Sequence, residues 1–261
     1  MRAASNRCDL TSGSIWRSLL LFALPLLAGS LVQQLYNTVD LIFVGNFIDK
    51  SASAAVGASS LLITCLVGVF GGIGVGSGIV IAQIFGSKDI ERFSRAIHNT
   101  AAMSIISGLL MMLLGYLLAP IYLRLVRTPA ELLDSATCYL RIYFLSFLAV
   151  VAYNFGSGIL RALGDSKSPL YAQLVGGLLN VAMDYLFIRV LDDGVNGVAW
   201  ATLISQTASA IMVLICLARL DPAYALRPAK IAFDRELLKQ TVSVGMPVGV
   251  QSLVITLSNV M

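Results

Sequence analysis

The feature that most constrains this 261-residue chain is its succession of long apolar stretches. Six of them are near or above the roughly 20 residues that a helix needs to cross a bilayer. A segment in hydrocarbon has to satisfy its own backbone N–H and C=O groups, and a helix does so. The sequence therefore predicts an all-α membrane protein, a six-helix transmembrane bundle with spans at Ile15–Val44, Ala54–Phe85, Ala96–Leu118, Leu140–Leu163, Pro169–Leu191 and Val195–Leu217.

Composition and charge agree with a membrane location. The chain is 57% hydrophobic and only 12% charged, whereas soluble domains carry roughly 25% charged residues. Thirteen of the 18 lysines and arginines fall on the side of the N-terminus in this topology, which predicts a cytoplasmic N-terminus by the positive-inside rule. We expect a multi-pass protein of the cell (inner) membrane, with the lipid bilayer as a partner and no nucleic acid.

Motifs for enzymatic chemistry are absent from the sequence. It contains no HExxH, no GxSxG and no histidine-rich cluster, and its four cysteines form no CxxC pair. These patterns would mark metalloproteases, hydrolases and zinc or disulfide sites. We therefore expect neither an enzyme nor a cofactor other than a coupling ion.

Two carboxylates lie inside the apolar stretches. Asp184 is the only charge in Leu170–Ile188, and Asp40 closes a first span whose only earlier charge is Arg17. A charged side chain at mid-membrane costs at least about 3 kcal/mol, so such residues usually face a cavity and bind or relay cations. The two acids therefore predict ion-coupled transport.

Other oxygen groups are expected at the depth of these acids. Helix rise places Asp40, Asp184 and Thr202 about 8 to 10 Å below the predicted outer surface, and Asn180 stacks one turn from Asp184. Bonding to a neighbouring helix is the alternative role for Asn180 or Thr202 taken alone. Together the four residues predict a site for Na⁺ or for a proton, and the sequence does not decide between the two.

Polar stripes extend from these positions along two helices. Facing stripes would line a lumen, although hydrogen bonding between helices is an equal alternative for the Gln and Ser members. Pro25 interrupts the first span and predicts a bend, either static or hinged. The stripes consist of Gln33, Tyr36, Asn37 and Asp40 in the first span and of Thr202, Gln206 and Ser209 in the sixth.

A glycine series and a single histidine complete the set of distinctive residues. Gly68, Gly72 and Gly76 recur every four residues, a spacing that predicts close helix contact in a membrane rather than a phosphate loop.

His98 adjoins basic residues at the inner end of the third span. We expect His98 to be a solvated or interfacial residue rather than a ligand.

The segment after Gly245 repeats the first span at an offset of 222 residues. Six identities fall within seventeen residues, among them Pro25, Ser30 and Asn37, which recur as Pro247, Ser252 and Asn259. A parallel repeat implies two six-span bundles. We therefore expect an N-terminal lobe at 1–220, a cytoplasmic linker at 221–240 and the first helix of a C-terminal lobe at 241–261. The rest of that lobe would be a missing partner, whether the chain is a split half or a non-functional truncated product.

Several motifs resemble those of the MATE (multidrug and toxic compound extrusion) family, in the style of its DinF-like branch. Leu21-Phe-Ala-Leu-Pro through Gln33-Gln-Leu-Tyr-Asn-Thr-Val-Asp is similar to the first helix of that family. Gly74-Val-Gly-Ser-Gly and Ala82-Gln-Ile-Phe-Gly resemble its second helix, and Leu160-Arg-Ala-Leu-Gly-Asp-Ser-Lys-Ser-Pro its fourth-to-fifth loop. Asn180-Val-Ala-Met-Asp and Gly197-Val-Ala-Trp-Ala-Thr are similar to the fifth and sixth helices.

The resemblance implies the N-lobe of a twelve-helix antiporter that exports organic cations and other small amphiphiles by alternating access. It also implies that Asp40, Asn180, Asp184 and Thr202 form the Na⁺ or H⁺ site, with Tyr36, Tyr139 and Asn154 as neighbours, and that Pro25 bends the first helix. The alternative is a flippase for lipid-linked oligosaccharides of the same broader fold. A pyrophosphate cargo would call for fixed cations, whereas the charges expected inside the spans are acidic.

Overall fold

The computed structural model describes residues 15–47, 50–221 and 224–260. Side chains are described over the same ranges except at 15, 36–37, 40–47, 50–61 and 259–260. Helices account for nearly all of this part of the chain, and no strand occurs in it. The predicted all-α class is therefore confirmed.

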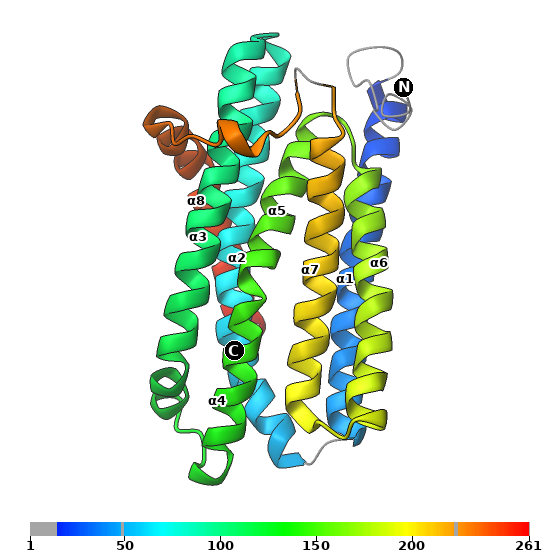
Figure 1. Cartoon of the computed structure of the whole chain (residues 1–261), viewed down its shortest axis with the longest axis vertical. Helices are drawn as coiled ribbons and strands as arrows, with labels where there is room; N and C mark the ends of the chain where they lie inside the picture. Colours follow the sequence, from blue (N-terminus) through cyan, green and yellow to red (C-terminus); the bar gives the residue numbers. More distant parts are fainter. Residues whose placement is uncertain (1–14, 48–49, 222–223, 261) are drawn as a thin grey trace.

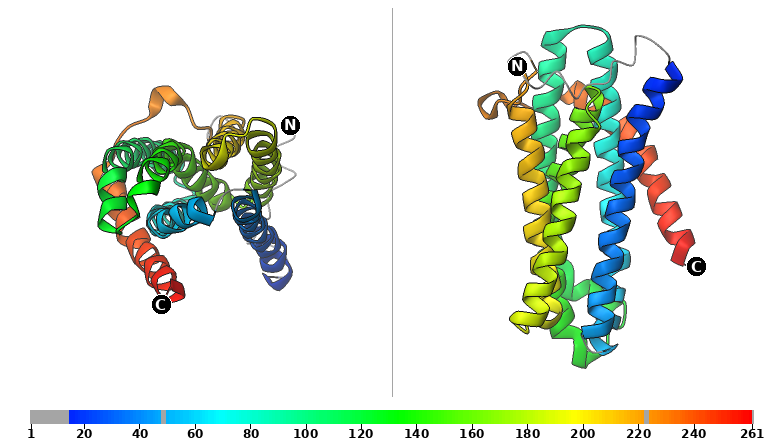
Figure 2. Two further views of the ribbon diagram at one scale, coloured as in Figure 1. Left: turned by 90° about the horizontal axis from the view of Figure 1, so that it is seen from below. Right: turned by 90° about the vertical axis from the view of Figure 1, so that its right-hand side faces the viewer.

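The helices form an elongated bundle with its long axis parallel to most of them (Figure 1). Figure 2 shows α1 and α8 diverging at one side of the bundle, with α2 between them. The elements are α1 (Ile15–Phe47), α2 (Lys50–Gly86), α3 (Ile90–Leu125), α4 (Ala130–Leu145), α5 (Phe147–Ala162), α6 (Lys167–Tyr185), η2 (Leu186–Val190), α7 (Gly194–Ala218), η3 (Pro228–Lys230) and α8 (Arg235–Val260).

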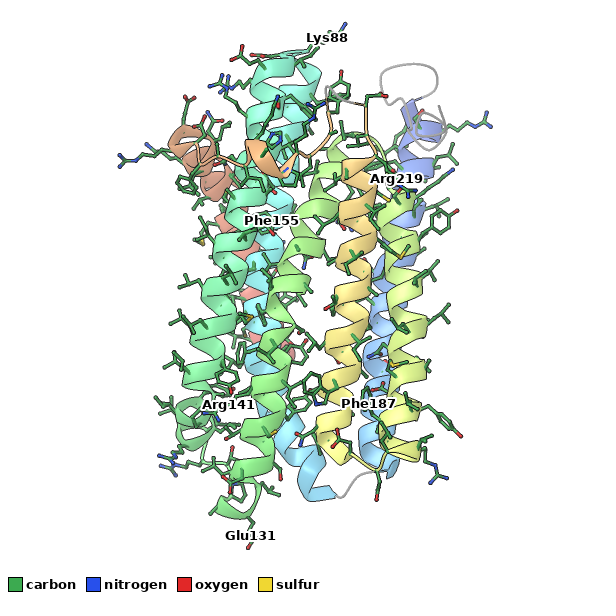
Figure 3. All side chains as sticks on the ribbon, in the orientation of Figure 1. Lys88, Glu131, Arg141, Phe155, Phe187 and Arg219 are labelled. Atoms are coloured by element: carbon green, nitrogen blue, oxygen red, sulfur yellow. The ribbon has the colours of Figure 1, made fainter. Side chains whose placement is uncertain are left out.

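Seven helical segments are long and apolar enough to cross a membrane. Six correspond to the predicted spans, and the seventh is α8, which begins at Arg235 inside the segment expected to be linker. Lys88 and Arg219 lie toward one end of the bundle and Glu131 at the other (Figure 3). We call the first of these the linker end, because residues 219–221 and 224–234 between α7 and α8 lie there (Figure 1).

The fourth span is broken in the middle, which the sequence did not predict. It comprises α4 and α5, and Ser146 separates them. The Ser146 hydroxyl donates to the carbonyl of Tyr143 (2.6 Å), and so does its backbone N–H (2.9 Å). A serine that bonds the preceding turn competes with the regular helical pattern and bends the helix.

Two clusters of apolar side chains hold the helices together. One lies around Phe144 and Phe147 at the break in the fourth span. The other lies toward the linker end around Phe93 and Leu160. There the ring centroids of Phe85, Phe93 and Tyr224 are 5.2–5.8 Å apart, in tilted and edge-to-face contacts. Many leucines remain exposed on the outer faces of α1 and α3, as expected for surfaces that contact lipid.

The predicted close helix contact is confirmed, and its partner is α8. A Cβ added to Gly72 would overlap the backbone of Gly249, and one added to Gly76 would overlap the backbone of Gly245. A Cβ on Gly68 would lie 3.2 Å from the Cβ of Ser252. Small residues on both helices therefore bring the two backbones into direct contact.

His98 holds the linker to the bundle; of the two expected environments, solvated or interfacial, the solvated one is wrong. Its side chain is buried, with 4% of its surface exposed. Nε2 accepts the backbone N–H of Arg227 (3.1 Å), and Nδ1 lies 2.6 Å from the carbonyl oxygen of Ser94. Because Nε2 accepts from a backbone donor, the proton is on Nδ1 and donates to Ser94, which is the neutral tautomer. The neighbouring Asn99 Oδ1 accepts the backbone N–H of Asp234 (2.8 Å).

Replacing His98 by leucine should loosen the linker at Arg227. The variant loses the Nε2 acceptor, and a hydrogen bond contributes about 1 kcal/mol, so amide exchange in the segment around Arg227 should rise roughly fivefold. Hydrogen–deuterium exchange with peptide-level mass spectrometry measures this change. Arg92→Gln is the matched control, because it removes only the exposed ion pair to Glu236 (3.4 Å). Equal exchange in wild type and His98→Leu would contradict the assigned role.

Candidate functional site

Two polar side chains lie one turn apart on the buried face of α6. Asp184 has no exposed surface, and Asn180 is 1% exposed. They share this face with Gly176, whose added Cβ would overlap the Ser209 hydroxyl of α7. The amide nitrogen and oxygen of Asn180 are both buried and make no hydrogen bond within the described part of the chain. Such groups are costly to bury unless something binds them.

The helix widens immediately after Asp184. Residues Leu186–Val190 form a π-helix, and the N–H of Leu191 reaches back to the carbonyl of Leu186 (3.0 Å). The chain then turns through Asp192, a non-glycine residue with a positive φ of 53°. Single π-turns inside helices are rare and frequently occur at functional sites. No feature of the sequence pointed to this one.

The facing helix α7 contributes a row of buried hydroxyls. Thr202, Ser205 and Ser209 are each at most 5% exposed. The Thr202 hydroxyl donates to the carbonyl of Val198 (3.0 Å), and that of Ser209 crosses to the carbonyl of Ala172 on α6 (3.0 Å). Each hydroxyl oxygen keeps lone pairs that accept a proton or coordinate a cation.

Helix register places Thr202 at the depth of the α6 pair. The two antiparallel helices touch at Gly176–Ser209 and again at Phe187–Gly197. Asn180 and Asp184 lie between these contacts on α6, and Thr202 lies between them on α7. A carboxylate, a carboxamide and a hydroxyl therefore lie at one level along two packed helices, and all three are buried. Oxygen ligands of this kind suit a hard cation, and a carboxylate also suits a proton.

Three predicted residues of α1 cannot be placed in this arrangement. The side chains of Tyr36, Asn37 and Asp40 lie outside the described residues. Helix α1 itself packs along α6, so the helix that carries Asp40 is adjacent to the helix that carries Asp184. Membership of Asp40 in the site stays a prediction.

The remaining predicted residues lie elsewhere in the bundle. Tyr139 is buried on α4, where its ring centroid is 6.2 Å from that of Tyr143. Gln206 is half-buried on α7. Gln33, Pro25 and Asn154 all line one cavity between α1, α5 and α6, and helix α1 continues through Pro25.

This cavity contains a basic residue that sequence reasoning missed. Arg161 in the last turn of α5 lines it, together with Ser166 and Gln173. Arg161 is one of the thirteen basic residues that the predicted topology places on the cytoplasmic side, and the structure makes it half-buried. Its place within the predicted span Leu140–Leu163 was the signal that could have identified it. The charges inside the bundle are therefore not all acidic.

The sequence model of the MatE family matches residues 25–186. The chain belongs to this family. It is 31% identical to the probable multidrug resistance protein YpnP of Bacillus subtilis (strain 168) over 252 residues, which are 95% of this chain and 55% of that protein. It is 23% identical to the multidrug export protein MepA of Staphylococcus aureus (strain MRSA252) over 239 residues, 92% of this chain and 53% of that one. The MATE chain thus spans about half the length of these relatives.

Solved structures of MATE transporters match the fold. An outward-facing multidrug resistance MATE transporter of the MOP superfamily has a TM-score of 0.83 and 28% identity, covering 90% of this chain and 52% of that one. An inward-facing structure of such a transporter has a TM-score of 0.80 and the same identity, and the match covers 86% of this chain and 51% of that one. The bundle of this MATE chain therefore corresponds to about half of a MATE transporter, as the sequence predicted.

Proposed function

We propose that this chain is the N-terminal lobe of a cation-coupled exporter that moves organic cations and other small amphiphiles out of the cell by alternating access. The observation that carries the proposal is the fully buried carboxylate of Asp184, at the same level as Asn180 and Thr202. Carboxylates inside membrane spans are rare and commonly mark ion pathways and proton relays. The names of the relatives, multidrug resistance and multidrug export proteins, support the substrate class.

In this proposal the coupling ion, Na⁺ or H⁺, is held by Asp184, Asn180 and Thr202 with Asp40 from α1. Ion binding neutralises the carboxylate, which changes the relative stability of the inward- and outward-open forms. A second lobe supplies the opposite wall of the substrate path, and roughly half of each relative lies beyond the matched part. The N-terminus and the linker end face the cytoplasm, in accordance with the distribution of basic residues.

Gradient-driven transport by the full-length protein tests this function. Proteoliposomes with an outward gradient of Na⁺ or of H⁺ are placed in a solution of a fluorescent organic cation. A tenfold ion gradient stores about 1.4 kcal/mol, enough for about a tenfold substrate gradient in one-for-one exchange. We expect one of the two gradients to drive accumulation of that size.

The control collapses the ion gradient with an ionophore while leaving the membrane intact. Accumulation should then fall to passive leakage. If the dye moves at the same rate under Na⁺, under H⁺ and with both gradients collapsed, ion coupling is refuted. Transport of a lipid-linked oligosaccharide in place of the dye would instead support the flippase alternative.

A further inference from the structure

Arg161 lines a cavity between α1, α5 and α6, toward the linker end. The volume of this cavity is about 150 Å³. By the same measure a single water molecule needs about 10–15 Å³, so the cavity has room for a group larger than several waters, such as a phosphate. Arg161 is the only charged residue among those that line it.

The guanidinium of Arg161 forms no ion pair within the described part of the chain. Its Nε is buried and has no hydrogen-bond partner in that part. The acid nearest in sequence, Asp165, is already engaged. Its carboxylate accepts the backbone N–H groups of Lys167 (3.1 Å) and Ser168 (2.9 Å) and the hydroxyl of Ser168 (2.6 Å), which caps the start of α6.

Two neutral donors line the same cavity. Ser166 and Gln173 are each only 4% exposed and line the cavity. The hydroxyl of Tyr153 is engaged, because it donates to the carbonyl of Pro169 (3.2 Å). A guanidinium without an ion-pair partner and two buried neutral donors are groups that bind an oxyanion.

A second cavity continues from this one. Its volume is about 290 Å³, and it lies between α1, α2 and α5. Arg161, Asn154 and Leu26 line both cavities, and the rest of the second wall is apolar, including Gly71, Val75 and Ile79. The combined space is therefore amphiphilic, with the cation where the polar and apolar parts join.

We propose that Arg161, Ser166 and Gln173 bind the phosphate group of an anionic membrane amphiphile, whose apolar part occupies the cavity between α1, α2 and α5. Arginine matches the geometry of phosphate with two parallel hydrogen bonds. The site lies at the linker end, where the predicted topology places the cytoplasmic leaflet and its anionic lipids. The ligand neutralises the guanidinium and links α1 to α5 and α6.

Native mass spectrometry of the full-length protein, titrated with phosphatidylglycerol, tests the proposal. The wild type should bind one molecule tightly. Arg161→Gln should weaken this binding by at least about tenfold, because a hydrogen bond to a charged group is lost. Gln173→Leu should weaken it less, and Arg161→Lys should fall between Arg161→Gln and the wild type. Arg219→Gln removes an exposed charge from the same end of the bundle and should leave the affinity within about twofold.

Two further titrations identify the source of the oxyanion. Diacylglycerol, which lacks the phosphate, should bind wild type and Arg161→Gln equally weakly. Inorganic phosphate should compete only at concentrations far above those of the lipid, whereas equal potency would assign the same site to the free anion. The proposal is overturned if phosphatidylglycerol binds wild type and Arg161→Gln with equal affinity, or if diacylglycerol matches phosphatidylglycerol in the wild type.

Discussion

The Asp184→Asn variant of the full-length protein should lose ion-driven transport almost completely. At an effective dielectric constant of about 20, two unit charges 4 Å apart attract by about 4 kcal/mol. Removing the charge should therefore weaken ion binding by roughly two to three orders of magnitude. Asparagine has nearly the same shape and fits the fully buried site. Dye accumulation in proteoliposomes under the coupling gradient gives the rate, and ²²Na⁺ binding or proton release gives the ion affinity.

Two comparisons separate loss of coupling from loss of folding. Asp193→Asn makes the same chemical change at an exposed carboxylate in the turn before α7, and transport should be unchanged. The melting temperature of Asp184→Asn should stay close to that of the wild type, because asparagine has nearly the same volume as aspartate and the buried site stays filled. A variant that keeps both its gradient dependence and its ion affinity would exclude Asp184 from the coupling step.

Substitution of Gly72 or Gly76 by alanine should separate α2 from α8. The added methyl group would meet backbone atoms of Gly249 or Gly245, and backbone cannot rotate out of the way as a side chain can. Overpacking of this kind costs about 1–3 kcal/mol per site, and the double substitution should cost more. The melting temperature of the full-length protein and its transport rate should both fall.

Gly71→Ala provides a matched control for this experiment. Gly71 lies on the same helix next to Gly72, but a Cβ at this position has no atom within 4 Å. Alanine favours a helix over glycine by about 1 kcal/mol in both cases, so the difference between the variants isolates the steric contact. If Gly71→Ala and Gly72→Ala shift the melting temperature equally, the α2–α8 contact does not contribute to stability.

The sequence predicted those parts of the structure that follow from placing each segment in the hydrocarbon of a membrane. Apolar length defined the spans, and the spacing of Gly68, Gly72 and Gly76 defined a face for close packing. The buried positions of Asn180, Asp184 and Thr202 followed from the cost of polar groups in hydrocarbon. These predictions need only the composition of one segment at a time.

The parts that it missed depend on contacts between segments. The break at Ser146 arises from a side-chain hydrogen bond that any serine in a helix has available. His98 resembled a loop residue, because its acceptor role requires the backbone of Arg227, far along the chain. Arg161 lies near the end of its predicted span, and only the placement of α1 and α6 around the cavity encloses it. The spacing of residues in one segment carries no information about these neighbours.

The bare contact between α2 and α8 has a mechanical consequence. Interlocked side chains resist sliding of one helix along another. Two backbones in direct contact at glycines have few side chains between them to oppose such sliding. Pulling the two helices apart would forfeit the whole contact, but a short slip along their shared axis would exchange one glycine neighbour for the next. The α2–α8 contact therefore resists separation of the two helices more strongly than sliding of one along the other.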